Sequence, residues 1–206
     1  MEQSYRDEMR EKLILATIDR LDASGIGGVH ARDLASEIGC AVGTIYNLVG
    51  GLDNLILLAC ARTLEEYRVY VTNYFSEEKA KGATNLQFLE ALGASYVDFS
   101  SLNRLRWQAV FEVSYEEDSD FHQIYATAQR QLLSLIIDVL KDINADADEV
   151  ELANIGRALW ASVHGITMLA VSNPKGALSR EKILIQCNRI IHPVVESLEA
   201  RAKAKS

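Results

Sequence analysis

The chain has 206 residues, of which 49% are hydrophobic and 24% are charged, so it is long and apolar enough to bury the core of one large domain or two small ones. Its formal net charge of −8 argues against a nucleic-acid binder with a basic surface throughout, and leaves room for a local binding site only. We find no signal peptide and no apolar run of about 18 residues, and we therefore expect a cytoplasmic protein that spans no membrane.

Apolar residues recur every three or four positions along almost the whole chain, and only two prolines, Pro174 and Pro193, interrupt it. This spacing predicts an all-α fold of about nine helices. We expect helices at residues 6–23, 30–38, 42–49, 52–76, 85–101, 102–114, 118–142, 148–172 and 179–203, after a frayed start at residues 1–5. The helix at 52–76 is too long to belong only to a small N-terminal unit, so we expect it to connect that unit to the rest.

The stretch from Leu34 to Val49 predicts two short helices joined by a tight turn. Ala35 supplies the small side chain that two steeply crossing helices need at their contact, and Gly39 can end the first helix without a Cβ clash. The inner face carries Leu34, Ala35, Ile38, Ile45 and Leu48. The small and polar outer face suits a helix-turn-helix whose second helix enters the DNA major groove, although the spacing alone also fits an ordinary helical hairpin.

The N-terminal sequence, over about residues 6–62, resembles the TetR/AcrR family of bacterial transcriptional regulators. The matching positions are the run from Asp33 to Cys40, with its small residue and its glycine, and the run Gly43-Thr44-Ile45-Tyr46. The resemblance implies a homodimer, an effector pocket in each C-terminal half, and loss of DNA binding when the effector binds. We expect a helix-turn-helix DNA-binding domain at residues 1–51 and a larger helical ligand-binding and dimerisation domain at residues 52–206.

The C-terminal half resembles a ligand-binding domain called the WHG type. The residues that carry this resemblance are Trp160, His164 and Gly165, with Arg106, Trp107 and Phe111 upstream. These motifs are less specific than those of the N-terminal region.

Three positions depart from the family pattern. Family members usually carry a capping serine at the start of the recognition helix, where this chain has Ala41, and loss of such a cap typically costs about 1 kcal/mol. The next position is often lysine or another polar residue, and here it is Val42. After the recognition helix the family usually shows an aromatic residue and Pro-Ser-Lys, where this chain has Val49-Gly50-Gly51-Leu52, so a lysine contact to DNA phosphate is absent.

The charges of the N-terminal region also bear on DNA binding. Residues 1–62 carry six cations and nine anions, a net charge of −3, and no Lys or Arg lies between Arg32 and Arg62. Because phosphate neutralisation supplies much of protein–DNA affinity, we expect a weak or unusually salt-insensitive complex. Contacts would come from helix N-termini and from the candidate DNA-binding residues His30, Arg32, Val42, Gly43, Thr44, Tyr46 and Asn47.

Aromatic residues are concentrated in the middle of the chain. They suit a plain helical core, or an apolar cavity with a few polar groups, which is the usual make-up of a small-molecule site. The candidate ligand-binding residues are Tyr67, Tyr96, Phe99, Trp107, Phe111, Phe121, Tyr125, His164 and Met168. His164 lies among apolar neighbours, so it needs a hydrogen-bond partner, which is a backbone carbonyl, Tyr96 or a ligand. A purely structural histidine is the alternative.

The last two predicted helices suit dimerisation. Small residues recur between Ala153 and Gly165, and the helix at 179–203 carries an apolar stripe wider than one neighbouring helix would cover. Three cysteines, Cys40, Cys60 and Cys187, fit no metal motif and predict buried thiols. The acidic run at residues 116–120 favours a solvated loop, and we expect no catalytic site, metal or cofactor.

Two functions fit these features. The leading hypothesis is a homodimeric repressor that binds a double-stranded DNA operator and is released by a small apolar effector. The alternative is a helical dimer of the same architecture that has lost DNA binding and acts as a ligand-binding or protein-interaction module. The span without cations at residues 33–61 favours the alternative.

Overall fold

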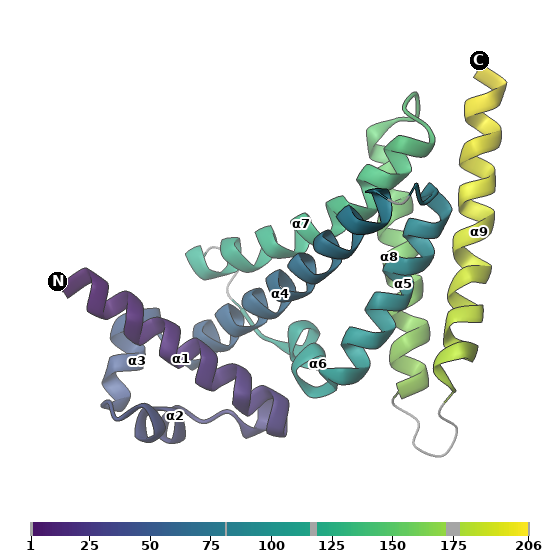
Figure 1. The fold of residues 1–206 in the computed structure, drawn as a ribbon. Helices are drawn as coiled ribbons and strands as arrows, with labels where there is room; N and C mark the ends of the chain where they lie inside the picture. Colours follow the sequence, from purple (N-terminus) through teal and green to yellow (C-terminus); the bar gives the residue numbers. More distant parts are fainter. Residues whose placement is uncertain (1, 81, 116–118, 172–177, 206) are drawn as a thin grey trace. The chain divides into compact units, whose positions relative to one another are not determined.

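The computed structural model describes residues 2–80, 82–115, 119–171 and 178–205. Every regular element in these ranges is helical, which confirms the predicted all-α fold of about nine helices (Figure 1). The elements are α1 (Glu2–Ser24), the 3₁₀ turn η1 (Ile26–Gly28), α2 (Ala31–Ile38), α3 (Val42–Val49), α4 (Leu52–Ala80), α5 (Asn85–Leu102), α6 (Arg104–Glu112), α7 (Asp120–Ile143), α8 (Glu149–Val171) and α9 (Arg180–Lys205). Residues 116–118, which form most of the acidic run, and residues 172–177, which include most of the gap between the last two predicted helices, lie outside the described residues.

The helix bounds differ from the predicted ones at a few ends. α1 already begins at Glu2, so the predicted fraying is wrong for residues 2–5, and Met1 lies outside the described residues. The side-chain amide of Gln3 donates to the Asp7 carboxylate one turn later, at 3.1 Å, and this pair supports the first turn. At the other end of the chain, α9 continues through Pro193 without a break.

The chain divides into two compact units, which share α4 and α7. The first unit comprises Met1–Tyr67 and Asn103–Arg130, and the second comprises Arg68–Leu102 and Gln131–Ser206. This division follows packing, and it differs from the functional division at residue 51, which stays a prediction. Each unit is considered by itself below.

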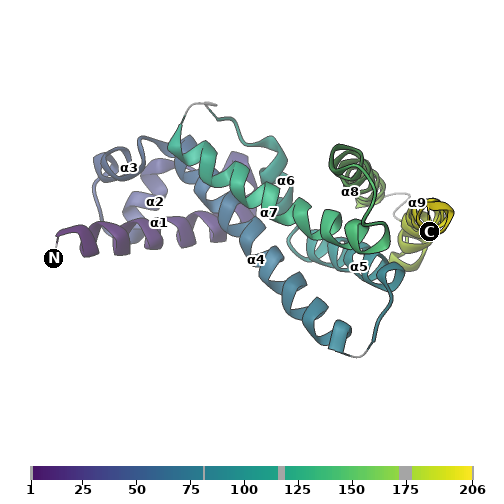
Figure 2. The same ribbon diagram turned by 90° about the horizontal axis from the view of Figure 1, so that it is seen from above.

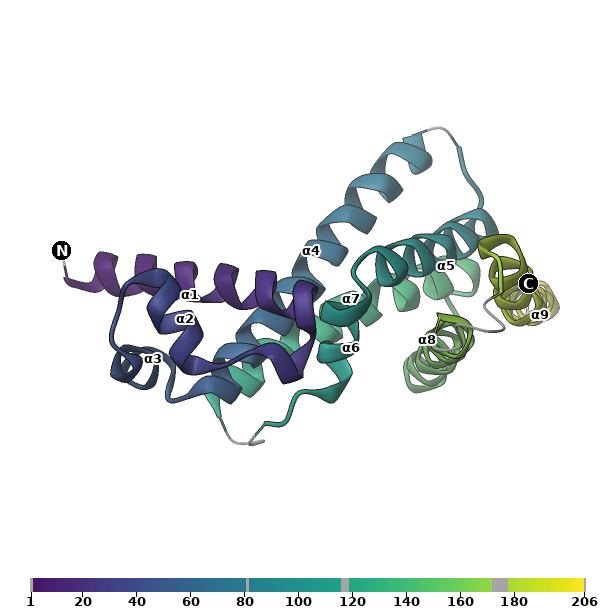
Figure 3. The same ribbon diagram turned by 90° about the horizontal axis from the view of Figure 1, so that it is seen from below.

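In the first unit, α1 packs against α2, α3, η1 and α6, and α2 packs against α3 (Figures 1 and 3). The side chains that are fully buried at its centre include Leu13, Leu21, Leu34, Ile45 and Leu55. Burying each such side chain stabilises the fold by roughly 1.5–3 kcal/mol. The helix-turn-helix therefore has its own apolar core beneath it.

In the second unit, α5, α8 and α9 lie side by side (Figures 1 and 2). A Cβ atom built on Gly156 would lie 3.2 Å from Cγ1 of Ile137, so this glycine lets α8 approach α7 closely. Most of the apolar stripe of α9 is buried within the unit, at Ile183, Cys187, Ile191, Val195 and Leu198. The stripe is therefore weaker support for dimerisation than the sequence indicated, because α5 and α8 already cover much of it.

Candidate nucleic-acid interface and effector site

The turn between α2 and α3 has the geometry that the sequence predicts. Gly39 adopts the left-handed conformation with φ 75°. The amide of Cys40 donates to the carbonyl of Ala35 at 2.9 Å and the amide of Gly39 donates to that of Ser36 at 3.3 Å, which together form a Schellman motif. Ala35 is buried at the contact. The predicted roles of Ala35 and Gly39 are confirmed.

The buried face of α3 differs by one residue from the prediction. Ile45 and Val49 are buried, whereas Leu48 is only half-buried. Residues four apart are offset by about 40° around a helix, whereas residues three apart are offset by about 60°, so the former share a face more closely. Ile45 and Val49 thus form the anchor of α3, and Leu48 lies at its border.

The outer face of α3 presents the residues that the sequence predicts for DNA contact. Gly43, Tyr46 and Asn47 are exposed, and Val42 and Thr44 are half-buried at the two borders of the same face. With 3.6 residues per turn, Gly43 lies between Tyr46 and Asn47 on this face. Tyr46 is 56% exposed. Its ring lies beside Gly51, at the turn into α4, where a Cβ atom built on the glycine would be 3.7 Å from the ring.

The two other candidate DNA-binding residues lie at the start of α2. His30 is the N-cap residue and is exposed, but its side chain makes no capping hydrogen bond. Arg32 is also exposed. The first residue before α3, Ala41, likewise provides no side-chain cap, as the missing serine predicts. Neither helix start is therefore capped by its N-cap side chain, although the amides of Asp33 and Thr44 donate to the carbonyls of His30 and Ala41.

Arg6 is a residue of this region that the sequence did not single out. Its Nη2 atom donates to the carbonyl of Asn47 at 3.1 Å, across 41 residues of sequence. The side-chain amide of Asn54 donates to the carbonyl of Val49 at 2.9 Å. Both bonds satisfy carbonyls in the last turn of α3, where a cation also interacts favourably with the helix dipole. Arg6 thus places a positive charge beside α3.

Most other cations of this region are held by carboxylates. The pairs are Arg10–Asp7 at 3.5 Å, Lys12–Glu8 at 2.8 Å, Arg20–Glu37 at 2.8 Å and Arg62–Glu11 at 2.8 Å. In the described part of residues 2–62, only Arg6 and Arg32 have no carboxylate partner. This pairing lowers the positive potential available for DNA beyond what the net charge of −3 already implies.

Five of the nine candidate effector residues belong to the first unit. The rings of Tyr67 and Trp107 meet edge to face with centroids 5.6 Å apart, and Phe111 packs on Trp107 at 5.7 Å. The hydroxyl of Tyr125 donates to the carbonyl of Val110 at 2.5 Å, and burial raises its pKa. Tyr67, Trp107 and Tyr125 are almost fully buried, Phe121 is half-buried and Phe111 is 37% exposed.

The other four candidate effector residues belong to the second unit. The hydroxyl of Tyr96 and Nδ1 of His164 are 2.5 Å apart, so Tyr96 is a partner of the histidine, as one of the three options foresaw. Trp160 stacks on the imidazole with centroids 5.7 Å apart. Burial lowers the pKa of His164, which favours a neutral ring that accepts from the Tyr96 hydroxyl. Phe99 and Met168 are half-buried.

Arg106, which entered the sequence analysis only as part of a resemblance, forms a charged cluster in the first unit. Its side chain is 9% exposed. Nη1 donates to Glu66 on α4 at 2.9 Å and Nη2 donates to Asn103 at 2.8 Å. Nε lies 3.2 Å from the Asp22 carboxylate on α1, an ion pair without hydrogen-bond geometry. One side chain thus links α6 to both α1 and α4.

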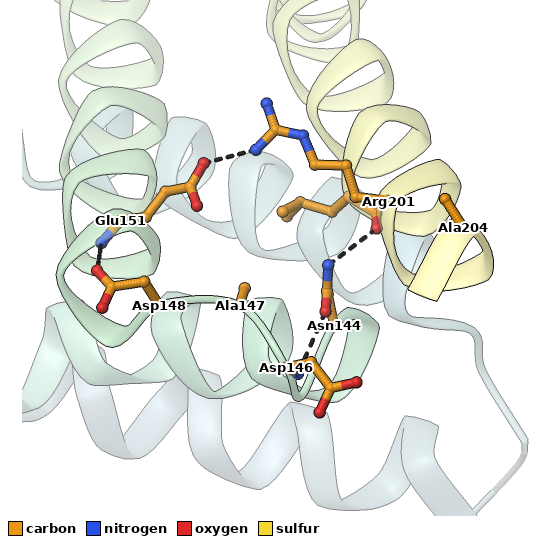
Figure 4. Close-up of a pocket in the computed structure, with 8 residues that line it drawn as sticks. Asn144, Asp146, Ala147, Asp148, Glu151, Arg201 and Ala204 are labelled. Atoms are coloured by element: carbon orange, nitrogen blue, oxygen red, sulfur yellow. Dashed lines mark hydrogen bonds and ion pairs between the residues drawn. The ribbon is translucent and has the colours of Figure 1, made fainter. Parts of the chain in front are cut away.

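A pocket of about 670 Å³ lies in the second unit between the α7–α8 turn and the end of α9 (Figure 4). Its lining residues are Asn144, Asp146, Ala147, Asp148, Glu151, Leu198, Arg201 and Ala204. Arg201 forms an ion pair with Glu151 at 2.5 Å, and the side-chain amide of Asn144 donates to the carbonyl of Leu198. None of the candidate effector residues lines this pocket, so it does not support their predicted role.

The cysteines and the described acidic residues show no reactive site. Cys60 and Cys187 are buried, and burial raises the pKa of Cys60 to about 12 and raises that of Cys187. Cys40 is half-buried. Within the described ranges, no three His, Cys, Asp or Glu side chains gather as a metal site would require. No single described helix is long and apolar enough to cross a membrane, and only α3 with part of α4, bent by 65°, reaches that length and composition.

Comparison with known proteins finds a family that matches part of the chain. The family described as "Tetracyclin repressor-like, C-terminal domain" matches residues 89–182. No curated protein matches the chain.

The solved structures that resemble the chain share its fold at low identity. A transcriptional regulator from Rhodococcus sp. Rha1 has 19% identity and a TM-score of 0.66, over 92% of this chain and 97% of that one. A protein described as a candidate TetR-family regulator from Mesorhizobium loti has 9% identity and a TM-score of 0.65, over 93% and 97%. A protein with unknown function from Rhodococcus sp. RHA1 has 14% identity and a TM-score of 0.67, over 94% and 95%. Residues 89–182 thus match a tetracycline-repressor-like C-terminal domain, and the chain as a whole shares the fold of these solved structures, which supports the resemblance to the TetR/AcrR family.

Proposed function

We propose that this protein is a homodimeric, DNA-binding transcriptional repressor that a small apolar effector releases from its operator. One observation carries the proposal: α3 is anchored through Ile45 and Val49 and turns an uncharged face of Gly43, Tyr46 and Asn47 to solvent. A short helix held in this way suits insertion into the major groove of duplex DNA. His30 and Arg32 at the start of α2 add contacts to the phosphate backbone.

The dimer contact is proposed on α8 and α9. On α8, Leu169 is 78% exposed, and Ala158 and Ala161 are exposed as well. On α9, Ile185 and Ile190 are exposed. Large apolar side chains on neighbouring helices of one unit favour an isologous contact with a second copy. Such a dimer would present two recognition helices to two half-sites of an operator.

The effector is proposed to be small and mainly apolar. The candidate residues supply aromatic rings, and His164 with Tyr96 supplies polar groups that can orient a ligand. Repression with release by the effector follows the resemblance to the family, as does the effector itself. The proposal includes no catalytic step.

Selection of bound sequences from random duplex DNA at low salt tests this function. The wild-type chain should enrich a defined sequence, and Tyr46→Ala should lose that enrichment because it removes the largest exposed side chain of α3. Tyr70→Ala is the matched control, since Tyr70 is similarly exposed on α4 and should have no effect. No enrichment by the wild-type chain would favour the alternative, a dimeric ligand-binding or protein-interaction module. The pairing of most N-terminal cations with carboxylates also favours that alternative.

A further inference from the structure

The exposed face of α3 contains a glycine, Gly43, for which the described residues give no packing reason. Gly43 does not have a positive φ, and a Cβ atom built on it would meet nothing within 4 Å. Glycine weakens a helix relative to alanine, so this residue is unfavourable for α3 itself. A glycine is useful where a backbone must approach another molecule closely. The face of α3 around Gly43 therefore fits a partner that comes into direct contact with its backbone.

The side chains around Gly43 define the chemistry of that partner. Asn47 offers one amide, Val42 and Thr44 offer methyl groups, and Tyr46 offers a ring with a hydroxyl. Neither a cation nor a carboxylate is present on α3. The commonest specific contact to guanine uses the bidentate Arg or Lys, and α3 has neither. An amide, by contrast, matches the N6 and N7 atoms of adenine, and a methyl group matches the thymine methyl.

The backbone beneath these side chains is held from outside the helix. Arg6 donates to the backbone carbonyl of Asn47 at 3.1 Å. The ring of Tyr46 rests beside Gly51, which has φ 153° and no side chain to push it away. The bond from Arg6 thus supports the backbone of the reading face, and base readout favours side chains that stand on such a rigid element.

We infer that α3 reads A·T base pairs in the major groove, with Asn47 binding adenine and the methyl groups of Val42 and Thr44 packing against thymine. This inference rests on the proposed DNA-binding function and adds the class of base pair to it. Arg6 and Arg32, the cations without carboxylate partners in the described part of residues 2–62, contact the backbone and add no base preference.

The test uses the full-length chain and duplexes selected from a random library at low salt. We expect the centre of each half-site to be rich in A·T pairs. Replacing thymine by uracil in a selected duplex removes only the 5-methyl groups, and it should weaken binding at least severalfold. Asn47→Arg should shift the preference from adenine to guanine at one position of each half-site, by about 5- to 150-fold. Asn73→Arg, at an exposed position of α4, is the matched control and should leave the preference unchanged.

The outcomes distinguish failure of the A·T inference from failure of the proposed DNA-binding function. Half-sites centred on G·C pairs, or a uracil duplex that binds as well as the thymine duplex, would overturn A·T reading and leave DNA binding intact. Absence of any selected sequence would overturn both. Retention of the adenine preference by Asn47→Arg, in a protein that still binds DNA, would overturn the role of Asn47.

Discussion

The exposed face of α3 and the exposed face of α8 and α9 differ in kind. On α3 the exposed residues are small or polar, as at Gly43 and Asn47, and the face carries no charge. On α8 and α9 they include large apolar side chains such as Leu169 and Ile185. Packing within each unit explains neither face. The difference teaches that the two faces suit different partners, a groove of nucleic acid for α3 and a second copy of the chain for α8 and α9.

The largest expected effect comes from a charge on the apolar face. Leu169→Glu would bury two carboxylates in the proposed dimer contact, at a cost of several kcal/mol. We expect light scattering at micromolar concentration to report a dimer for the wild-type chain and a monomer for this variant. Leu102→Glu is the control, because Leu102 is 85% exposed at the end of α5 and should leave the mass unchanged. A wild-type monomer under these conditions would refute the dimer.

The next effect concerns the charged cluster that links α6 to α1 and α4 in the first unit. Arg106→Met should lower the free energy of unfolding by about 1–3 kcal/mol, since it removes hydrogen bonds to Glu66 and Asn103 and the ion pair with Asp22. Chemical denaturation measures this loss. Arg104→Met, at an exposed position of the same helix, should change stability by less than about 0.5 kcal/mol. Equal losses in the two variants would contradict the role of the cluster.

A smaller effect distinguishes cations without a carboxylate partner from paired ones near the proposed DNA-binding face. With Arg6 and Arg32 as the available cations, a dimer neutralises up to about four phosphates, and log affinity should fall with log salt at a slope no steeper than about −3.6. Arg6→Ala should make that slope shallower by about 2 in the dimer. Lys12→Ala, whose side chain is held by Glu8, should leave it unchanged. A slope near −10 in the wild-type chain would contradict the account.

The smallest effect is a pH dependence of the second unit. Burial lowers the pKa of His164 in the folded chain, so the unfolded chain binds more protons as the pH falls through about 6.5. Stability should therefore be fully present above that pH, decline below it and level off once the folded pKa is passed. His164→Gln should remove this component, as seen in unfolding curves from pH 5 to 8. A wild-type stability that rises on acidification over this range would have the wrong sign.

Much of the fold could be predicted because its signals are local. The spacing of apolar residues located nine helices, and Gly39 marked the end of α2 through its own conformational freedom. The register of α3 was missed by one residue, since Leu48 and Val49 are both apolar and only packing distinguishes them. The start of α1 was also missed, because a single polar pair supports it.

The site was less predictable, because its contacts join residues far apart in sequence. No local pattern indicates that Arg6 binds the carbonyl of Asn47, 41 residues away, or that Arg106 binds Glu66, 40 residues away. The hydrogen bond of Tyr96 to His164 was foreseen only as one of three options. The assignment of the candidate effector residues to two packing units was not foreseen, since the sequence shows only that the helix from residue 52 is long.

The central claim is that the exposed face of α3 contacts DNA, and Gly43→Ala tests it most directly. This change should leave the free energy of unfolding unchanged or raise it by up to about 1 kcal/mol, because alanine favours a helix and its Cβ meets nothing. We predict that the same variant binds a selected duplex at least tenfold more weakly than the wild-type chain in an anisotropy titration. A variant that is as stable as the wild-type chain and binds the duplex equally well would contradict the claim.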